Sequence, residues 1–146
     1  MHARIDLDKT NYSLGAIQQI DLKVRLIRAF DTDELDKIYI AYCRYKKFPS
    51  VMPLFSEEYL YPQSDVFAYY DNEVMVGFTM MFRYNTHSVA ANQFAWTYHK
   101  PKIRLGIRSL HYICAHYKQE GFKHLYLGDA ASYKQYLDGF ELCGPA

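Results

Sequence analysis

The sequence is poor in the residues that would place it in several specialised classes of protein. Its 146 residues include only three cysteines, five prolines, seven glycines and one tryptophan. Cys43, Cys114 and Cys143 are odd in number and lie far apart. Their spacing indicates neither a disulfide framework nor a metal site, so we expect reduced structural thiols. The net charge of +1 gives no overall attraction to nucleic acid or membranes.

Long apolar stretches are also missing. The longest, Val74 to Phe82, is far too short to span a bilayer. No apolar run follows Arg4 near the N-terminus, so the sequence does not begin as a signal peptide does. These absences predict a cytoplasmic protein with no membrane partner.

Apolar and aromatic residues, by contrast, are abundant. Half of the residues are apolar and 17% are aromatic, with 15 tyrosines. This composition is sufficient for one buried core, and the length suits a single domain over residues 1–146. Residues 1–20 show no clear period, so we expect them to form a loose N-terminal arm.

The first half of the chain combines one strand and two helices with a run of strands. Residues 22–30 alternate as a strand does, and Asp31 and Glu34 have the spacing of a capping box for a helix that stops before Pro49. A short second helix is predicted from Ser56 to Pro62. Strands are then expected at 66–70, 74–82 and 88–98, with turns at 71–72 and 85–87, and they should form an antiparallel meander.

The second half of the chain has the pattern of a strand–helix–strand crossover connection. Apolar residues recur with helical spacing over 104–120, Gly121 can cap that helix, and short strands are expected at 124–127 and 140–142 around a short helix at 130–137. The unit from 88 to 127 has the length of a right-handed crossover, which makes its two strands parallel neighbours. The predicted fold is a mixed, mostly antiparallel α/β sheet with helices on both faces.

This order of elements resembles the GNAT acyltransferase superfamily over residues 22–143. The segment from Val24 to Leu35 looks like the opening strand and acidic helix start of that family, and Tyr136-Leu137-Asp138-Gly139-Phe140-Glu141 looks like its closing signature. Residues 94–143 also resemble the C-terminal half of the arginyl and leucyl-type aminoacyl-tRNA–protein transferases. That narrower likeness rests on the segments 105–109 and 121–128, on Tyr133-Lys134 and on Glu141-Leu142.

The resemblance implies a site for an acyl donor at the start of the 104–120 helix. A helix N-terminus offers unpaired N–H groups to phosphate, and Gly106 would permit close approach. The alternative is that Gly106 relieves crowding between helix and sheet. The preceding strand would pair with the arm of the donor through its backbone. The implied donor-binding residues are Phe94, Ala95, Trp96, Lys102, Arg104, Leu105, Gly106, Ile107 and Arg108.

The family also implies catalytic groups. Many members use a glutamate on the third meander strand, but residues 88–98 contain no carboxylate. His99, at the end of that strand, is the candidate base, because imidazole titrates near neutral pH. Tyr136 and Tyr133 occupy the position of the family's acid, and Asp129 is a candidate for shaping the acceptor pocket. No metal is predicted.

The leading functional hypothesis is therefore an N-acyltransferase that acts on a primary amine, either a peptide N-terminus or a small molecule. Ile103 and Arg108 stand where the family's phosphate loop has other residues, so acyl-CoA and aminoacyl-tRNA both stay open as donors. A non-catalytic GNAT-like module that binds a partner or forms a homodimer is the alternative. A third hypothesis is an RNA-binding module, because aromatic and basic residues alternate over 94–108. The family normally has one more strand; either this strand is missing here, or a partner chain or the N-terminal arm covers that edge.

Overall fold

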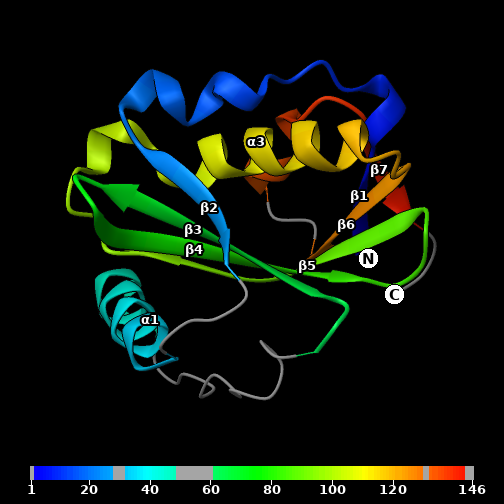
Figure 1. The fold of residues 1–146 in the computed structure, drawn as a ribbon. Helices are drawn as coiled ribbons and strands as arrows, with labels where there is room; N and C mark the ends of the chain where they lie inside the picture. Colours follow the sequence, from blue (N-terminus) through cyan, green and yellow to red (C-terminus); the bar gives the residue numbers. More distant parts are fainter. Residues whose placement is uncertain (1, 28–31, 49–60, 130–131, 144–146) are drawn as a thin grey trace.

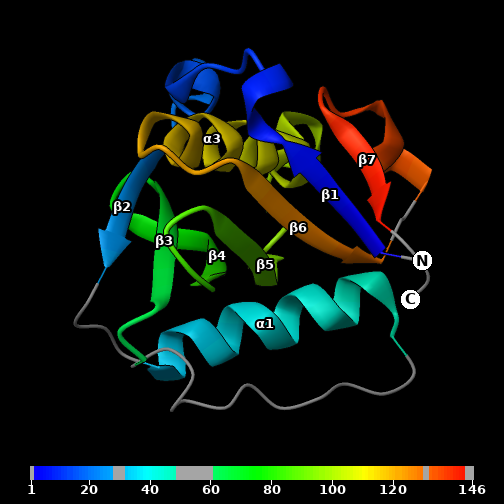
Figure 2. The same ribbon diagram turned by 90° about the vertical axis from the view of Figure 1, so that its right-hand side faces the viewer.

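The protein is built around one seven-stranded mixed sheet with helical layers on both faces. The computed structural model describes residues 2–27, 32–48, 61–129 and 132–143. The strands lie in the order β2-β3-β4-β5-β6-β1-β7, and every neighbouring pair is antiparallel except β5 and β6. Helix α1 covers one face and helix α3 the other (Figures 1 and 2). The predicted mixed, mostly antiparallel sheet with helices on both faces is confirmed.

The predicted meander is formed by β3 (Ser64–Asp71), β4 (Val74–Arg83) and β5 (Ser88–Trp96), with β2 (Lys23–Ile27) pairing at the outer edge of β3. The first turn consists of Asn72 and Glu73, both at positive φ, which is the backbone of a tight two-residue hairpin. In the second turn Asn85 Oδ1 accepts bonds from the N–H groups of His87 and Ser88, at 2.8 and 2.9 Å. Side-chain oxygens of this kind compete with the ladder and end a strand.

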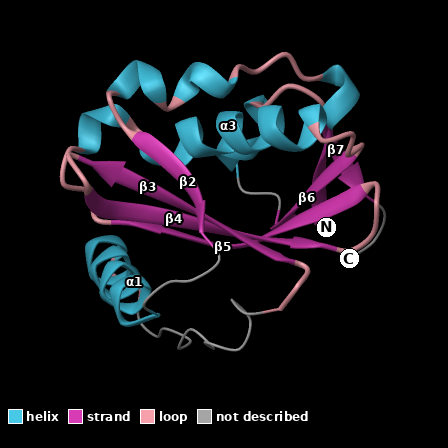
Figure 3. Ribbon diagram, in the orientation of Figure 1, coloured by secondary structure: helices cyan, strands magenta, loops and turns pink. Residues whose placement is uncertain are grey.

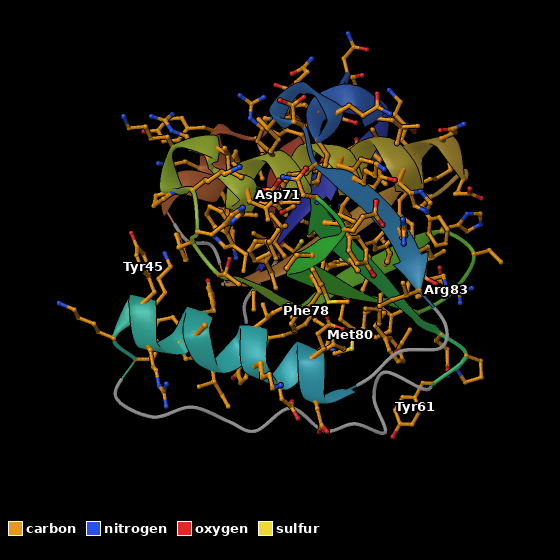
Figure 4. The ribbon with its side chains drawn as sticks, turned by 60° about the vertical axis from the view of Figure 1, so that its left-hand side comes forward. Tyr45, Tyr61, Asp71, Phe78, Met80 and Arg83 are labelled. Carbon is orange, nitrogen blue, oxygen red and sulfur yellow. The ribbon has the colours of Figure 1, made fainter. Side chains whose placement is uncertain are left out.

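The two long helices agree with the apolar spacing of the sequence. Helix α1 (Thr32–Lys46) carries Asp33 and Glu34 in its first turn, where carboxylates favour the positive end of the helix dipole. Its buried Leu35 packs in a cluster with Phe78 and Met80 of β4, which Figure 4 shows projecting toward α1. Helix α3 (Leu105–Gln119) ends next to Gly121, which has a φ of +92° as a helix C-cap requires. The second helix predicted from Ser56 to Pro62 falls mostly on residues 49–60, which lie outside the described residues, as does Asp31.

The N-terminal segment corrects the prediction of a loose arm. Strand β1 (His2–Asp6) lies between β6 (His124–Asp129) and β7 (Phe140–Cys143) and is antiparallel to both. The N-terminal arm thus provides the additional strand that the sequence from 22 to 143 lacks. The side chains of Ala3, Ile5 and Leu7 are fully buried. A strand of five residues is too short for its alternation to stand out from a polar sequence.

Short 3-10 turns complete the layer that contains α3. They are formed by Leu7–Lys9, Leu14–Ala16 and Gln18–Ile20, and Figure 3 shows these turns crossing above α3. The contacts include a stack of Tyr12 on His111, with ring centroids 4.2 Å apart. The short helix predicted at 130–137 is a 3-10 turn, Ser132–Tyr136.

The cysteines, the helices and the metal-ligating side chains can be surveyed over the described part of the chain. Cys43 and Cys114 are buried free thiols, and Cys143 is half-buried and free. Within the same residues, none of the helices combines the length and apolar character needed to cross a membrane. No cluster of metal-ligating side chains occurs in that part of the chain either.

Candidate functional site

A cleft opens in the middle of the sheet because β5 and β6 separate. They pair in parallel only from Ser88 to Ala90, whereas β5 continues to Trp96. A β-bulge in β5 accompanies the separation: Met80 pairs with Gln93 but Met81 pairs with Ala91, so Asn92 is the additional residue. A bulge bends and twists its strand. Among the described strands, therefore, none pairs with residues 91–96 of β5 on the side that faces β6.

The cleft has a volume of about 370 Å³ and takes residues from both helical layers. Tyr42 and Lys46 come from α1, and Gly106, Ile107, Ser109, Leu110 and Ile113 come from α3. The sheet and its connections supply Thr79, Met81, Ala91, Asn92, Gln93, Phe94, Tyr98, Leu127 and Lys134. This is a mixed polar and apolar site of the size that binds small ligands and cofactors.

The N-terminus of α3 lies at this cleft. Arg104 precedes the helix in the left-handed backbone region, with a φ of 53°, and no side-chain cap is formed there. The N–H of Arg108 makes the bond back to the carbonyl of Arg104, at 3.2 Å. The preceding N–H groups, those of Leu105 to Ile107, belong to the first turn and have no carbonyl of their own helix to bind. Such N–H groups attract anions.

Gly106 lies in this first turn, where its missing side chain leaves space. Apart from its chain neighbours and the backbone of its own helix, a Cβ atom built at Gly106 would meet no atom of the described residues within 4 Å. The alternative that Gly106 relieves crowding between helix and sheet is therefore wrong. That role belongs to Gly77 of β4, where a Cβ would lie 2.8 Å from Cβ of Trp96. Gly106 thus leaves open space at the start of α3, beside the cleft.

The predicted donor-binding residues divide into three groups. Phe94, Gly106 and Ile107 line the cleft. The second group is fully buried and consists of Ala95, Trp96 and Leu105. Ala95 packs in the apolar cluster between the sheet and α1, whereas Trp96 and Leu105 pack in the cluster between the sheet and α3. Their side chains are core, so only their backbones are placed to contact a ligand.

The basic residues of the predicted donor site form the third group. Lys102 and Arg104 are exposed beside the start of α3. Arg108 points elsewhere, because its Nη1 donates to Oε1 of Gln19 at 3.3 Å.

The two catalytic candidates whose side chains are described, His99 and Tyr136, do not line the cleft. Nε2 of His99 lies 2.8 Å from Oδ2 of Asp71, and its Nδ1 lies 3.2 Å from Oγ1 of Thr97, outside the lining of the cleft. Bonds from Lys100 and His99 lower the pKa of the Asp71 carboxyl. Tyr136 is 82% exposed and does not line the cleft. The side chains of Tyr133 and Asp129 lie outside the described residues.

Sequence reasoning missed several polar groups that do line the cleft. Nζ of Lys134 donates to the carbonyl of Leu127 at 3.2 Å, which holds a positive charge where β5 and β6 have separated. On β4, the hydroxyl of Thr79 is 2.7 Å from that of Tyr69, and burial raises the pKa of Tyr69. The sequence places Lys134 next to Tyr133 in a motif of the resemblance, but it gives no reason to choose the lysine over the tyrosine as a residue of the site.

A second hollow adjoins the cleft. It has a volume of about 480 Å³, and its lining is Ala3, Tyr84, Asn85, Ser88, Ala90, Ala91 and Tyr126. Ala91 belongs to both cavities. The hydroxyl of Tyr126 accepts a bond from Nη1 of Arg4 at 3.4 Å, and Arg4 is paired with Glu141 at 2.7 Å. The two cavities therefore share one lining residue on β5.

Known proteins resemble this chain in structure only. No protein-family model matches the sequence, and no curated protein matches it. A lysylphosphatidylglycerol synthetase C-terminal domain from Agrobacterium fabrum superposes with a TM-score of 0.64 at 14% identity, over 88% of this chain and 46% of that one. This chain thus spans less than half the length of that domain.

Shorter acetyltransferases also superpose. A ribosomal-protein-alanine N-acetyltransferase from Brucella melitensis biovar Abortus 2308 gives a TM-score of 0.60 at 11% identity, over 86% of this chain and 96% of that one. A GNAT family acetyltransferase from Elizabethkingia anophelis, with acetyl-CoA bound, gives 0.52 at 12% identity, over 78% and 69%. At these identities the likeness establishes the fold.

Proposed function

We propose, from the premise that this chain has the GNAT fold as its sequence predicted, that it is an N-acyltransferase. It would transfer an acyl or aminoacyl group from acyl-CoA or aminoacyl-tRNA to a primary amine. The observation that carries the proposal is the cleft between β5 and β6, which continues to the uncapped start of α3. A protein of the same fold was solved with acetyl-CoA bound, which favours a donor of that kind.

Two parts of the cleft suit two parts of such a donor. The backbone of β5 from 91 to 96 has no ladder partner on the side facing the cleft, so an amide-bearing arm can pair with it as an added strand. The N–H groups of Gly106 and Ile107 then face the phosphates that follow the arm in the donor. Lys102 and Arg104 add exposed positive charge beside them.

The reaction needs the amine and the acyl carbon to meet near the bulge of β5. The amine attacks the carbonyl, a C–N bond forms, and the C–S or C–O bond of the donor breaks. One proton leaves the amine nitrogen and one proton reaches the leaving sulfur or oxygen. Among the described residues that line the cleft there is no carboxylate, so positioning carries much of the rate. The ammonium of Lys134 is the lining group suited to stabilising negative charge on the carbonyl or leaving atom.

The amine itself would enter through the second hollow, which shares Ala91 with the cleft. A peptide N-terminus or a small amine both fit this proposal. The acid roles of Tyr136 and Tyr133, the base role of His99 and a cytoplasmic location stay predictions.

Donor binding tests the proposal directly. Coenzyme A and an aminoacylated tRNA are added separately, and the melting temperature and the amide hydrogen exchange of the first turn of α3 are measured. We expect at least one donor to raise the melting temperature and to slow exchange at Gly106 and Ile107. Exchange at Gly121, at the opposite end of α3, is the internal control and should not change. If neither donor has these effects, the proposal is wrong.

One observation favours the alternative, a catalytically inactive GNAT-like domain that binds a partner or forms a homodimer. The described lining of the cleft contains neither a carboxylate nor a histidine that could accept the proton of the amine. Turnover separates the two functions. A donor that binds with no acyl transfer to a panel of peptides and small amines supports the inactive module, whereas transfer that is lost in Lys134→Gln supports the enzyme.

A further inference from the structure

Aromatic rings gather where the end of α1 meets the segment after β5. The rings of Tyr45 and Tyr98 are stacked with their centroids 3.9 Å apart and their planes within 11°. Tyr42 lies parallel to Tyr98 at 5.9 Å, and Trp96 touches Tyr98 from β5 at 4.4 Å. We call Tyr42, Tyr45 and Tyr98 the tyrosine stack. Tyr42 and Tyr98 also line the cleft, so the stack stands at its margin.

Tyr98 holds its position in an unfavourable backbone conformation. Its φ is 56°, a region that a bulky aromatic residue rarely occupies. Strain of this kind persists only where the surrounding contacts fix it, and it is concentrated at functional sites. Here the fixing contacts are the rings of Tyr42, Tyr45 and Trp96. The chain thus keeps a flat ring at the margin of the cleft at an energetic cost.

Positive charge accompanies the rings. Nζ of Lys46 lies 5.5 Å from the centroid of the Tyr98 ring and 6.0 Å from that of Tyr42. Lys46 is exposed and lines the cleft as well. Tyr45 is 54% exposed although one of its faces is covered by Tyr98, and Figure 4 shows it projecting from the end of α1. An exposed ring next to a lysine is the combination that binds a nucleobase and its phosphate.

We infer that the tyrosine stack binds the nucleobase at the far end of the donor. This inference rests on the proposed function. The base stacks on the exposed side of Tyr45 and lengthens the column of parallel rings, while Lys46 neutralises a neighbouring phosphate. Coenzyme A carries its adenine nucleotide at this end, remote from the thioester, so the chemistry that the stack recognises is an adenine nucleotide. In an aminoacyl-tRNA, by contrast, the terminal adenosine carries the acyl group itself. The strand edge and the start of α3 would bind the remainder of the donor.

The test removes first the nucleobase from the ligand and then the aromatic ring of Tyr45 from the protein. Affinities of coenzyme A and of 4′-phosphopantetheine, which keeps the arm but lacks the adenine nucleotide, are measured by calorimetry. We expect Tyr45→Ala to weaken coenzyme A by about tenfold, the effect of one lost stack, and to leave 4′-phosphopantetheine unchanged. Tyr45→Phe keeps the ring and should bind as the unaltered protein does. Tyr61→Ala is the matched control, because Tyr61 is 49% exposed and lies away from Tyr45 (Figure 4).

A second pair of ligands identifies the source of the nucleotide. One is a short single-stranded RNA that ends in adenosine, and the other is the same RNA with an abasic 3′ end. A loss of affinity in Tyr45→Ala that is confined to the adenosine-ended RNA overturns the assignment to the far end of the donor, because the terminal adenosine of an aminoacyl-tRNA carries the acyl group itself. The same loss confined to coenzyme A supports the stack and assigns it to that donor.

Equal affinity of Tyr45→Ala and the unaltered protein for every base-carrying ligand overturns the inference but leaves the proposed function intact. Failure of the unaltered protein to bind any of the four ligands removes the proposed function, and the inference with it.

Discussion

The two halves of the sheet are built from very different stretches of the chain. In β3, β4 and β5, strands that are neighbours in the sheet are also neighbours in sequence, and Asp71 pairs with Val74 across a two-residue turn. In β6, β1 and β7 the two ends of the chain are brought together, and His2 pairs with Cys143. The two halves meet at β5 and β6, which share three residue pairs. The cleft lies at this weakly paired boundary.

This difference separates the part of the fold that is specified by residues close in sequence from the part that depends on residues far apart in sequence. A short turn closes a hairpin with little loss of chain entropy, so the meander can form early during folding. Strand β1 can pair only after the two ends of the chain have met. A site at the boundary then depends on both halves, because Ala91 comes from the meander whereas Leu127 and Lys134 come from the other half.

The largest expected effect concerns the order in which the two halves of the sheet form during folding. Ile5 of β1 and Met80 of β4 are both buried, and replacing either by alanine is expected to destabilise the protein by about 3 kcal/mol. If the meander forms first, Met80→Ala slows folding, whereas Ile5→Ala mainly speeds unfolding. Stopped-flow folding and unfolding rates across a range of urea measure both effects. The opposite assignment of the two variants would show that the chain ends associate first.

Glycine replacements test how strongly the close contact between β1 and the segment before β7 contributes to the stability of the half built from the chain ends. Gly139 has a φ of +73°, and a Cβ there would lie 2.3 Å from the carbonyl oxygen of Asp6 in β1. Gly139→Ala therefore combines backbone strain with a clash, and we expect a loss of about 2.5 kcal/mol in urea unfolding. Gly121, with a φ of +92° and nothing within 4 Å, is the matched control, and Gly121→Ala should cost about 1 kcal/mol. Equal losses would mean that the approach of Asp6 is unimportant.

A second pair of glycines probes the boundary itself. Gly77→Ala places a Cβ 2.8 Å from Cβ of Trp96 and 3.1 Å from the carbonyl oxygen of Ala95, and overpacking of this kind should cost about 1.5 kcal/mol. Gly106→Ala meets no neighbour, so thermal unfolding should show stability unchanged or raised by up to about 1 kcal/mol. The added methyl group instead enters the space proposed for phosphate, and coenzyme A binding by Gly106→Ala should weaken. Unchanged binding would place the phosphate elsewhere.

The smallest expected effect concerns the two histidines of α3. Burial lowers the pKa of both His111 and His116. Arg108 further lowers the pKa of His111 while Asp138 raises it, and Glu120 and Asp65 raise that of His116. His111 stacks on Tyr12 of the N-terminal segment, whereas His116 packs on Phe67 of the meander at 5.0 Å. Each histidine therefore reports on a different half.

The direction of the pH effect follows from those lowered pKa values. The unfolded chain binds protons as pH falls through the ordinary histidine pKa of about 6.5, while the folded protein still resists protonation. The free energy of unfolding should thus be constant above neutral pH and decrease as pH falls below about 6.5. Urea titrations at several pH values should give a flatter decrease for His111→Gln and for His116→Gln. An unchanged slope in either variant would show that folding does not lower the pKa of its histidine.

The sequence predicted the parts of the fold that local patterns specify. The meander, its turns and both long helices were found because β-branched runs, turn residues and helical spacing are properties of adjacent residues. Strand β1 was missed because its partners lie more than a hundred residues away in sequence. The resemblance leaves open whether the extra strand is missing or whether a partner chain or the N-terminal arm covers that edge, and the structure shows that the N-terminal segment forms a strand there.

The site was harder to predict than the fold. Gly106 and Phe94 of the predicted donor site line the cleft, whereas His99 does not. His99 instead contacts Asp71, which lies 28 residues away in sequence. Lys134 reaches the cleft through a bond to the backbone of Leu127, a contact with no signature in sequence. The bulge at Asn92 depends on the register of β4 and likewise has none.

The pairing of His2 with Cys143 has a mechanical consequence. Both residues lie at the same end of the β1–β7 ladder, and the ladder continues from them toward Ile5 and Phe140. A force that pulls these two ends apart acts along the hydrogen bonds of an antiparallel pair, and it loads those bonds one after another. Strand β7 should therefore peel away at low force while the meander stays intact. A load applied across β3 and β4 in shear would meet many bonds at once.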